Sequence, residues 1–333
     1  MWRSWSRSPG PLGSLSGPGS PQVCQSAAHS LTSEQARAAD WQTGGDSRPP
    51  NAPPLLKSVL ALLVDYHLHL APDGAALGAA ELSGARVALY ADRAREAGIG
   101  HLCLTEHCHR FRQAGGLLDH PFWHQSAQAD LDTYVAAVRS HGEPVACGIE
   151  LDWIEGREDE LAALVECRDF DLVLGSVHWL GGLAVDHPDY AIWEDVAADE
   201  VWRRYFAQVR AAAASGLFDV LAHLDLAKVF GNTASQSVVD SEHELTADAI
   251  AAAGVAVEIS TAGLRKAAGE LYPAPGLLRA LHRRGVPITL GSDGHVPEDL
   301  GRDFDRALSA AHACGYRTVS MFTGRERREV PLG

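Results

Sequence analysis

Short apolar runs alternate with longer amphipathic stretches along most of the chain. Runs rich in Val, Ile and Leu predict buried strands, because the strands of a parallel sheet are covered on both faces. Predicted strands cover residues 59–66, 101–105, 145–151, 172–177, 220–223, 255–259 and 288–292, with a weaker candidate at 318–322. The stretches between them show a helical period at residues 87–97, 131–141, 199–214, 247–253, 277–284 and 304–313.

This regular alternation of strand and helix predicts an α/β fold with a parallel sheet. Seven or eight strand–helix units favour a closed barrel over an open, doubly wound sheet. Small turn segments, such as residues 98–100 and 285–287, separate a helix from the next strand. No glycine-rich phosphate loop follows a predicted strand, so the sequence carries no nucleotide-binding fingerprint.

Residues 1–55 differ from the rest of the chain in composition. They are rich in Ser, Gly and Pro and show no sustained apolar period, which is typical of disordered segments. Arg3 and Arg7 stand among serines, but the apolar centre of a secretory signal is missing. We expect either a disordered extension or an over-long gene model at 1–55, followed by one barrel domain at 56–333.

Composition narrows the class of protein further. The formal net charge of -15 argues against a nucleic-acid partner, since a phosphate backbone is bound by basic surfaces. No apolar run approaches the roughly 18 residues of a membrane-spanning helix. The six cysteines are scattered and form no C-x-x-C pair, which predicts reduced thiols and a cytoplasmic location.

Polar clusters fall at the C-terminal ends of the predicted strands, where barrel enzymes build their active sites. In the first cluster, the alternation of a strand places Asp65, His67 and His69 on one side. Asp65 is then a candidate for orienting a metal ligand without binding the ion itself. The candidate residues of the other clusters are Glu106, His107, Glu150, His178, His223, Asp293 and His295.

Each cluster alone has an ordinary explanation, since a histidine or carboxylate after a strand is often a hydrogen-bonded or solvent-facing residue. Six strands that all end in this way are hard to attribute to chance. Imidazole nitrogens and carboxylate oxygens without thiolates suit Zn, Mn or Fe(II). The sequence therefore predicts a hydrolytic site that holds several divalent ions.

The order of these motifs resembles the PHP (polymerase and histidinol phosphatase) superfamily. It runs from H-x-H at residues 67–69 through Gly-Ser-Val-His at 175–178 to Gly-Ser-Asp-Gly-His at 291–295. Longer stretches, including Asp186-His187-Pro188 and residues 261–266, resemble the PHP-type histidinol-phosphatases of histidine biosynthesis. The resemblance covers about residues 62–300 and includes the spacing of the motifs.

The resemblance implies a distorted TIM-like (β/α)7 barrel that holds two to three divalent metal ions, with Zn, Mn or Fe as candidates. It assigns two ions that share one carboxylate, the first held by His67, His69, Glu150 and Asp293, the second by Glu150, His178 and His223.

The third ion is the point where this chain departs from the family pattern. The resemblance gives it His107 and His295, but the family commonly adds a histidine where this chain has Ala75. Asp73 and Glu106 are the two nearby carboxylates that could take its place. The sequence leaves open which of them does, or whether the third site is incomplete.

The activity implied is hydrolysis of a phosphomonoester, most specifically histidinol phosphate. Glu150, Asp293 and His178 would serve catalysis through the metals. Arg265 is the candidate for a bidentate phosphate clamp, because a guanidinium matches phosphate geometry, and Lys228 is a second candidate.

Three alternatives remain at this stage. The chain could be a PHP phosphoesterase for a nucleotide or another small phosphomonoester, or a non-catalytic PHP module. An amidohydrolase-type barrel also begins with H-x-H, but it usually carries a bridging lysine where this chain has Glu150. We expect a small phosphorylated substrate, with no nucleic-acid or membrane partner, and leave open whether the chain forms a homo-oligomer.

Overall fold

The computed structural model describes residues 63–333. The predicted extension at 1–55 and the beginning of the first predicted strand lie outside the described residues. Seven parallel strands form one sheet in the order β1-β2-β3-β4-β7-β8-β9. Their bounds are β1 Leu63–Asp65, β2 Ile99–Leu104, β3 Val145–Asp152, β4 Leu172–Ser176, β7 Val220–Leu221, β8 Ala256–Ser260 and β9 Ile288–Gly291.

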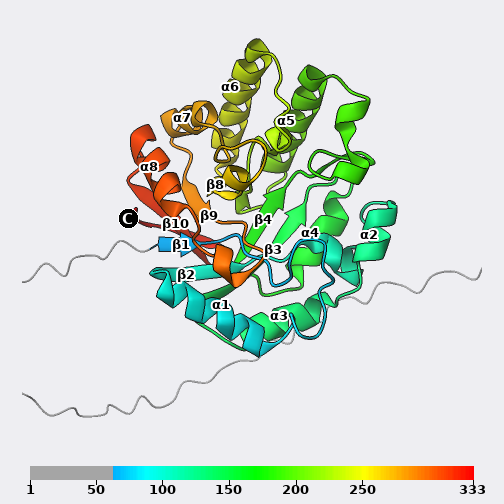
Figure 1. The fold of residues 1–333 in the computed structure, drawn as a ribbon, viewed down its shortest axis with the longest axis vertical. Helices are drawn as coiled ribbons and strands as arrows, with labels where there is room; N and C mark the ends of the chain where they lie inside the picture. Colours follow the sequence, from blue (N-terminus) through cyan, green and yellow to red (C-terminus); the bar gives the residue numbers. More distant parts are fainter. Residues whose placement is uncertain (1–62) are drawn as a thin grey trace, which may run out of the picture. The chain divides into compact units, whose positions relative to one another are not determined.

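The sheet curls until its first and last strands meet (Figure 1). The amide of Tyr66 donates to the carbonyl of Leu290 at 2.9 Å, and the amide of His69 donates to Gly294 at 2.8 Å. These bonds join the end of β1 to the end of β9. The predicted (β/α)7 barrel is therefore confirmed, and it is nearly closed.

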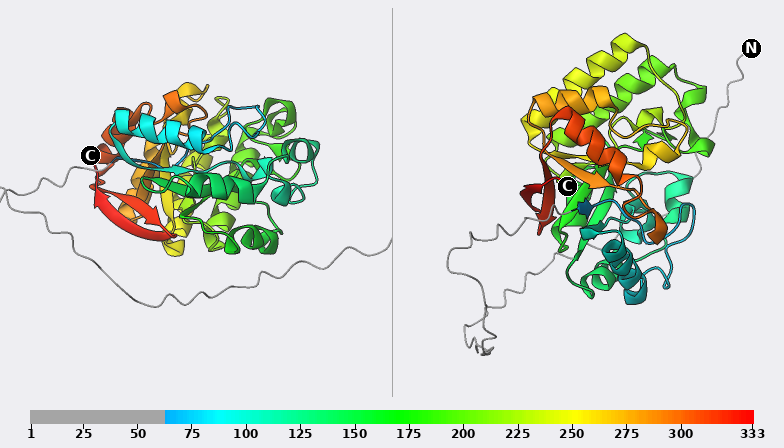
Figure 2. Two further views of the ribbon diagram at one scale, coloured as in Figure 1. Left: turned by 90° about the horizontal axis from the view of Figure 1, so that it is seen from below. Right: turned by 60° about the vertical axis from the view of Figure 1, so that its left-hand side comes forward.

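Helices cover the outer face of the barrel, as the two further views also show (Figure 2). Every predicted helix is present, although the one predicted at 247–253 begins much earlier, at Gln236. Their bounds are α1 Gly84–Glu96, α2 Pro121–Ser126, α3 Leu131–Arg139, α4 Glu158–Glu166, α5 Ala198–Ala214, α6 Gln236–Ala253, α7 Pro275–Arg283 and α8 Phe304–Cys314.

Local sequence signals explain where several helices begin and end. The hydroxyl of Ser83 accepts from the amide of Arg86 at the start of α1, and the carboxylate of Asp130 accepts from Thr133 at the start of α3. Gly254 ends α6 with a φ of 72°, a conformation that glycine adopts without strain. The acidic first turn of α4 was a start signal that the strand-and-helix pattern alone did not reveal.

Two short antiparallel hairpins lie outside the barrel sheet: β5 Trp179–Leu180 with β6 Leu183–Ala184, and β10 Thr318–Thr323 with β11 Glu326–Pro331. The weaker predicted strand at 318–322 is thus confirmed as β10, although it is not a barrel strand. The 3-10 turns are η1 Cys108–Arg110, η2 Arg112–Ala114, η3 Pro188–Tyr190, η4 Ile192–Glu194, η5 Leu226–Lys228, η6 Ala262–Arg265 and η7 Pro297–Asp299.

The barrel strands form the core of the domain. All eight residues of β3 are buried, as are all five of β4 and of β8. This burial on both faces explains why the strands read as continuous apolar runs in the sequence. Among residues 63–333, no helix combines the length and the apolar character that a membrane crossing requires.

Candidate metal centre

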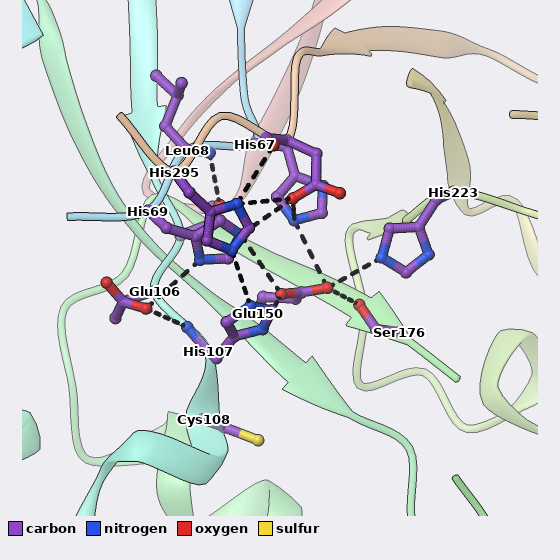
Figure 3. A network of polar contacts seen from close by, with 12 residues as sticks. His67, Leu68, His69, Glu106, His107, Cys108, Glu150, Ser176, His223 and His295 are labelled. Atoms are coloured by element: carbon purple, nitrogen blue, oxygen red, sulfur yellow. Dashed lines mark hydrogen bonds and ion pairs between the residues drawn. The ribbon is translucent and has the colours of Figure 1, made fainter. Parts of the chain in front are cut away.

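The eight predicted metal ligands gather at the C-terminal ends of the strands, around the carboxylate of Glu150 at the end of β3. Figure 3 shows His67, His69, His107, His223 and His295 around this carboxylate. They come from the ends of strands that lie far apart in the sequence, because the C-terminal ends of parallel strands share one end of the barrel. The members are His67, His69, His107, Glu150, His178, His223, Asp293 and His295.

The first predicted group surrounds the end of β1. Nε2 of His67 lies 3.5 Å from Oε1 of Glu150 and 3.6 Å from Oδ1 of Asp293. Nε2 of His69 lies 3.6 Å from Oε2 of Glu150 and 3.3 Å from the same Asp293 oxygen. His67, His69 and Glu150 thus bring one ligand atom each to within 4.8 Å of one another, and Asp293 lies beside both imidazoles.

The second predicted group lies on the other side of the same carboxylate. Nε2 of His223 is 3.0 Å from Oε1 of Glu150, and Nε2 of His178 is 3.5 Å from it. Glu150 therefore faces both groups and has the position that a bridging carboxylate needs.

The third group contains the departure from the family pattern. Nε2 of His107 lies 3.4 Å from Nε2 of His295, and the ring of His69 stacks against each of these two imidazoles. Oδ1 of Asp73 lies only 2.7 Å from Nε2 of His295. This contact with His295 holds the pKa of Asp73 below its usual range. Asp73 thus lies where the third site lacks a ligand, whereas Ala75 offers no donor.

Glu106 is the other candidate for the third site, but both of its carboxylate oxygens already have partners in the protein. Its Oε2 accepts from the amides of Leu70 at 2.9 Å and Ala71 at 3.4 Å. Its Oε1 pairs with Arg110 at 3.1 Å and lies 3.4 Å from Nδ1 of His69. A carboxylate held in this way fixes the chain after β1 and the ring of His69, and it has little freedom to turn toward a third ion.

Glu258 is a functional residue that the sequence reasoning missed. It lies in the apolar strand β8, where Oε1 is 2.9 Å from Nδ1 of His67 and Oε2 accepts from the amide of His223 at 2.8 Å. A carboxylate on Nδ1 fixes the ring so that Nε2 faces the metal. The strand β9 passes close by, and a Cβ on Gly291 would lie 1.7 Å from Oε1 of Glu258, so only glycine fits there.

Asp152 and Ser176 support the second group in the same manner. Oδ1 of Asp152 lies 2.6 Å from Nδ1 of His178, and the hydroxyl of Ser176 donates to Oε1 of Glu150 at 2.5 Å. The signal for Asp152 was present, because it lies two residues beyond Glu150 on the same strand and therefore on the same side.

Asp65 acts on the backbone next to the predicted ligands and not on their rings. Its carboxylate accepts from the amide and hydroxyl of Ser292, at 2.9 and 2.6 Å, and from the amide of Gly301 at 2.9 Å. It contacts the backbone of His67 rather than either imidazole. Asp65 therefore holds the segment that carries Asp293, and burial raises the pKa of Asp65 to about 6.

The charges of the cluster favour a cation. Burial opposes ionisation of Glu150, but the rings of His107, His67 and His178 outweigh it and hold the pKa of Glu150 well below its usual range. Nε2 of His67 and both ring nitrogens of His69 are buried without a hydrogen-bond partner within residues 63–333. Buried nitrogens without partners are costly unless a ligand satisfies them, so this donor set fits divalent metal ions.

Backbone strain occurs at two members of the cluster. His223 and Asp293 have φ angles of 24° and 51°, which residues other than glycine rarely adopt. Such conformations persist only where the surrounding structure enforces them, and they gather at functional sites. Here the Glu258 bond to the His223 amide and the Asp65 bonds to Ser292 supply that enforcement.

Comparison with known proteins agrees with this geometry. A family model described as the PHP domain matches residues 81–262, which is more than half of the chain. The chain belongs to the PHP domain family. A probable histidinol-phosphatase of Deinococcus radiodurans is 37% identical over 276 residues, covering 81% of this chain and 99% of the relative.

Two other similar proteins carry related names. The histidinol-phosphatase of Bacillus subtilis is 26% identical over 248 residues, covering 66% of this chain and 90% of that protein. The crystal structure of histidinol phosphate phosphatase from Lactococcus lactis, complexed with Zn, L-histidinol and phosphate, superposes with a TM-score of 0.65. The superposition covers 80% of this chain and 98% of the Lactococcus lactis chain, with 20% sequence identity. The two proteins therefore share the PHP fold.

Lys228 and Arg265, the two predicted phosphate-binding residues, have different surroundings in this PHP domain. Nζ of Lys228 contacts Asp225 at 3.1 Å, Glu270 at 2.6 Å and the carbonyl of Leu271 at 2.8 Å, and the side chain is buried. Its charge is already balanced, so the geometry argues against the predicted phosphate contact. Lys228 holds η5 against the segment before α7.

Arg265 lies beside the metal centre of the PHP domain. Its NH2 group donates to the carbonyl of Ser292 at 2.6 Å, and its NH1 group to the carbonyl of Thr261 at 3.4 Å. The side chain is 17% exposed. These bonds steady the segment that carries Asp293, and the predicted contact with phosphate stays a prediction.

Proposed function

We propose that the protein is a metal-dependent phosphomonoesterase that hydrolyses histidinol phosphate to histidinol and phosphate. One observation carries the proposal: eight imidazoles and carboxylates converge on Glu150 in a PHP domain that is 37% identical to a probable histidinol-phosphatase. The fold neighbour from Lactococcus lactis, a crystal structure complexed with Zn, L-histidinol and phosphate, supports the same substrate.

The metal content follows from the donor groups. We assign two to three divalent ions, and zinc is favoured because the structure from Lactococcus lactis is complexed with it. His67, His69, Glu150 and Asp293 would hold the first, Glu150, His178 and His223 the second, and His107, His295 and Asp73 the third. When bound, such ions lower the pKa of a coordinated water and offset the charge of a phosphate group.

The protein contributes fixed geometry to this chemistry. Glu258 sets the ring of His67 and Asp152 sets the ring of His178, so that each presents Nε2 to the centre. Arg265 and Asp65 hold the strained segment at Ser292 from two sides. A site preorganised in this way needs no rearrangement during the reaction, which is the main source of electrostatic stabilisation in enzymes.

One assay tests the proposed function. Phosphate release is measured from histidinol phosphate, a nucleoside monophosphate and p-nitrophenyl phosphate, with Zn, Mn or Fe(II) supplied separately to metal-free protein. We expect the highest kcat/KM for histidinol phosphate. A clear preference for the nucleotide would favour the alternative PHP phosphoesterase, and no turnover with any metal would favour a non-catalytic module.

A further inference from the structure

A cavity of about 700 Å³ opens onto the metal centre. His107 and His178, two of the predicted ligands, form part of its lining. Cavities of this size accommodate an entire small organic molecule, far more than a phosphate group. The part of the cavity beyond the metal ligands is therefore available to the group that carries the phosphate.

One side of this cavity is lined by aromatic rings, which we call the ring wall: His109, Phe122, Trp179, His187 and Tyr190. The ring centroid of Phe122 lies 5.0 Å from that of His109, 5.1 Å from that of His187 and 5.6 Å from that of Trp179. Tyr190 continues the wall at 4.9 Å from His187. The ring wall offers π faces and edges for a flat group.

The ring wall is connected directly to the metal centre. The ring of His109 stacks on that of His107 at 4.8 Å, and Trp179 follows His178 in the chain. The wall is assembled from η1, α2, β5 and η3, so it exists only in the folded domain. A ligand whose phosphate lies on the metals would have its organic part against these rings.

Charge is distributed unevenly around the cavity. Asp186 lies on the lining between β6 and η3, and no side chain within residues 63–333 donates a hydrogen bond to its carboxylate or pairs with it. The cations on the lining are Arg110, which pairs with Glu106, and Lys266, whose Nζ lies 3.9 Å from Oδ2 of Asp73. The unpaired charge that faces the cavity from the ring-wall side is negative.

We propose that the ring wall and Asp186 form the leaving-group subsite, and that they select an alcohol that carries a flat ring and a positively charged amine. The carboxylate would pair with the ammonium group, while the rings would stack on the flat group and attract the cation. The proposal rests on the proposed function, because histidinol has an amine and an imidazole. It goes further by assigning the residues that choose the substrate.

Asp186→Asn separates this role from catalysis. We expect kcat/KM for histidinol phosphate to fall about tenfold or more, mainly through KM, because a charge-assisted bond is lost. For p-nitrophenyl phosphate, which has no amine, kcat/KM should stay within about twofold. Phe122→Leu keeps the apolar volume but removes a ring, and it should weaken histidinol phosphate in the same direction.

Metal content and a matched variant complete the test. Asp195→Asn makes the same charge change on an exposed residue outside the cavity lining and should alter neither substrate. Equal losses on both substrates in Asp186→Asn, or loss of a bound ion, would overturn the subsite and place Asp186 in the metal centre. Unchanged discrimination would overturn it too.

Failure of the proposed function gives a different result. In that case the wild-type protein does not hydrolyse histidinol phosphate, but histidinol itself can still be tested as an inhibitor of p-nitrophenyl phosphate hydrolysis. Inhibition that weakens about tenfold in Asp186→Asn would support the subsite on its own. Absence of inhibition by histidinol, or inhibition that is equal in both proteins, would reject it.

Discussion

At the C-terminal ends of the barrel strands, imidazoles and carboxylates gather and several of their buried atoms lack hydrogen-bond partners, whereas at the opposite end Asp171 and Asp219 each pair with an arginine. Asp171, before β4, accepts from Arg139 at 2.7 Å and from the amides of Cys147 and Gly324 at 2.9 Å each. Asp219, before β7, accepts from Arg325 and from the amide of Val173.

The contrast separates two uses of buried charge. We call the end of the barrel with Asp171 and Asp219 the closed end, and the end with the predicted metal ligands the open end. At the closed end, arginines and backbone amides satisfy these two carboxylates, so the chain alone accounts for the arrangement. At the open end, imidazoles and carboxylates face one another and His67 and His69 retain buried nitrogens without hydrogen bonds. At the open end the supporting bonds, such as those of Glu258 to His67 and His223, come from the chain, and the remaining buried nitrogens are left for a ligand.

The largest effect is expected from Glu150→Gln at the open end. A bridging carboxylate offsets the repulsion between two ions, and a neutral amide does not. We expect activity to fall by more than about a hundredfold, beyond the range typical of residues that only support a ligand. Bound metal, measured by elemental analysis, should fall by more than one ion per chain.

Asp171→Asn is the matched control, because it replaces a buried carboxylate by an amide at the closed end. It should leave metal content unchanged. Full metal loading and near-normal turnover in Glu150→Gln would show that the bridge has been assigned to the wrong residue.

The same Asp171→Asn variant should lose stability instead of activity. Its carboxylate holds Arg139 and two backbone amides, and removal of one oxygen acceptor leaves part of this network unsatisfied. We expect the free energy of unfolding to fall by about 2–3 kcal/mol, with turnover per folded molecule unchanged. Denaturant unfolding gives the first quantity, and a large loss of turnover would contradict the separation of the two ends.

A smaller effect is expected at the third predicted metal site, for which the sequence did not decide between Asp73 and Glu106 as the missing ligand. The contact between Asp73 and His295 and the occupied state of Glu106 favour Asp73. In Asp73→Asn the third ion should be lost at about tenfold lower chelator concentration. Glu106→Gln should lower the thermal midpoint, because an amide cannot both accept from the amides of Leu70 and Ala71 and pair with Arg110, but it should retain the ion.

Ala75→His tests the same assignment from the other direction. If Asp73 completes the site, an added imidazole should not tighten the third ion. Tighter binding in Ala75→His, together with an indifferent Asp73→Asn, would show that the third site of this chain is incomplete. A third ion that is held as firmly as the others in all three variants would place its ligands elsewhere.

The sequence predicted the strands and the polar clusters at their C-terminal ends, because both signals are local, whereas the assignment of the eight ligands followed from the family resemblance and stays a prediction. A buried parallel strand is apolar throughout, and the residue after it lies at the open end whatever the rest of the fold. Glu258 gave no such signal, since its role depends on β1 and β7 lying beside β8. The partner of Asp65 gave no signal for a related reason: the strand period fixes the side of the strand, but not the contact with Ser292 across the barrel seam.

The cavity lining could not be predicted from the sequence. Phe122, Trp179 and Tyr190 belong to segments whose spacing in the chain says nothing of their distance in space, and single aromatic residues are most often core residues. Lys228 was misjudged because a lysine in a family-like motif does not reveal that Asp225 and Glu270 already neutralise it.

The smallest expected effect concerns a titrating group far from the metal ligands. His243 in α6 packs edge-on against Phe206, and its Nε2 has no hydrogen-bond partner within residues 63–333. Burial lowers the pKa of His243 to about 4 from its ordinary value near 6.5. The neighbouring charges are Lys228, which also lowers it, and Asp240, Glu244 and Glu270, which oppose the shift.

The sign of the pH effect follows from proton uptake. Between pH 4 and 6.5 the unfolded chain protonates this imidazole and the folded protein does not, so stability falls as the pH falls through that window. Between pH 7 and 5.5 the free energy of unfolding should fall by about 1 kcal/mol less in His243→Gln than in the wild type. Denaturant unfolding of both proteins at several pH values measures this difference, and the exposed His312→Gln is the control. Equal pH slopes in the wild type and His243→Gln would mean that His243 binds its proton equally in the folded and unfolded chains.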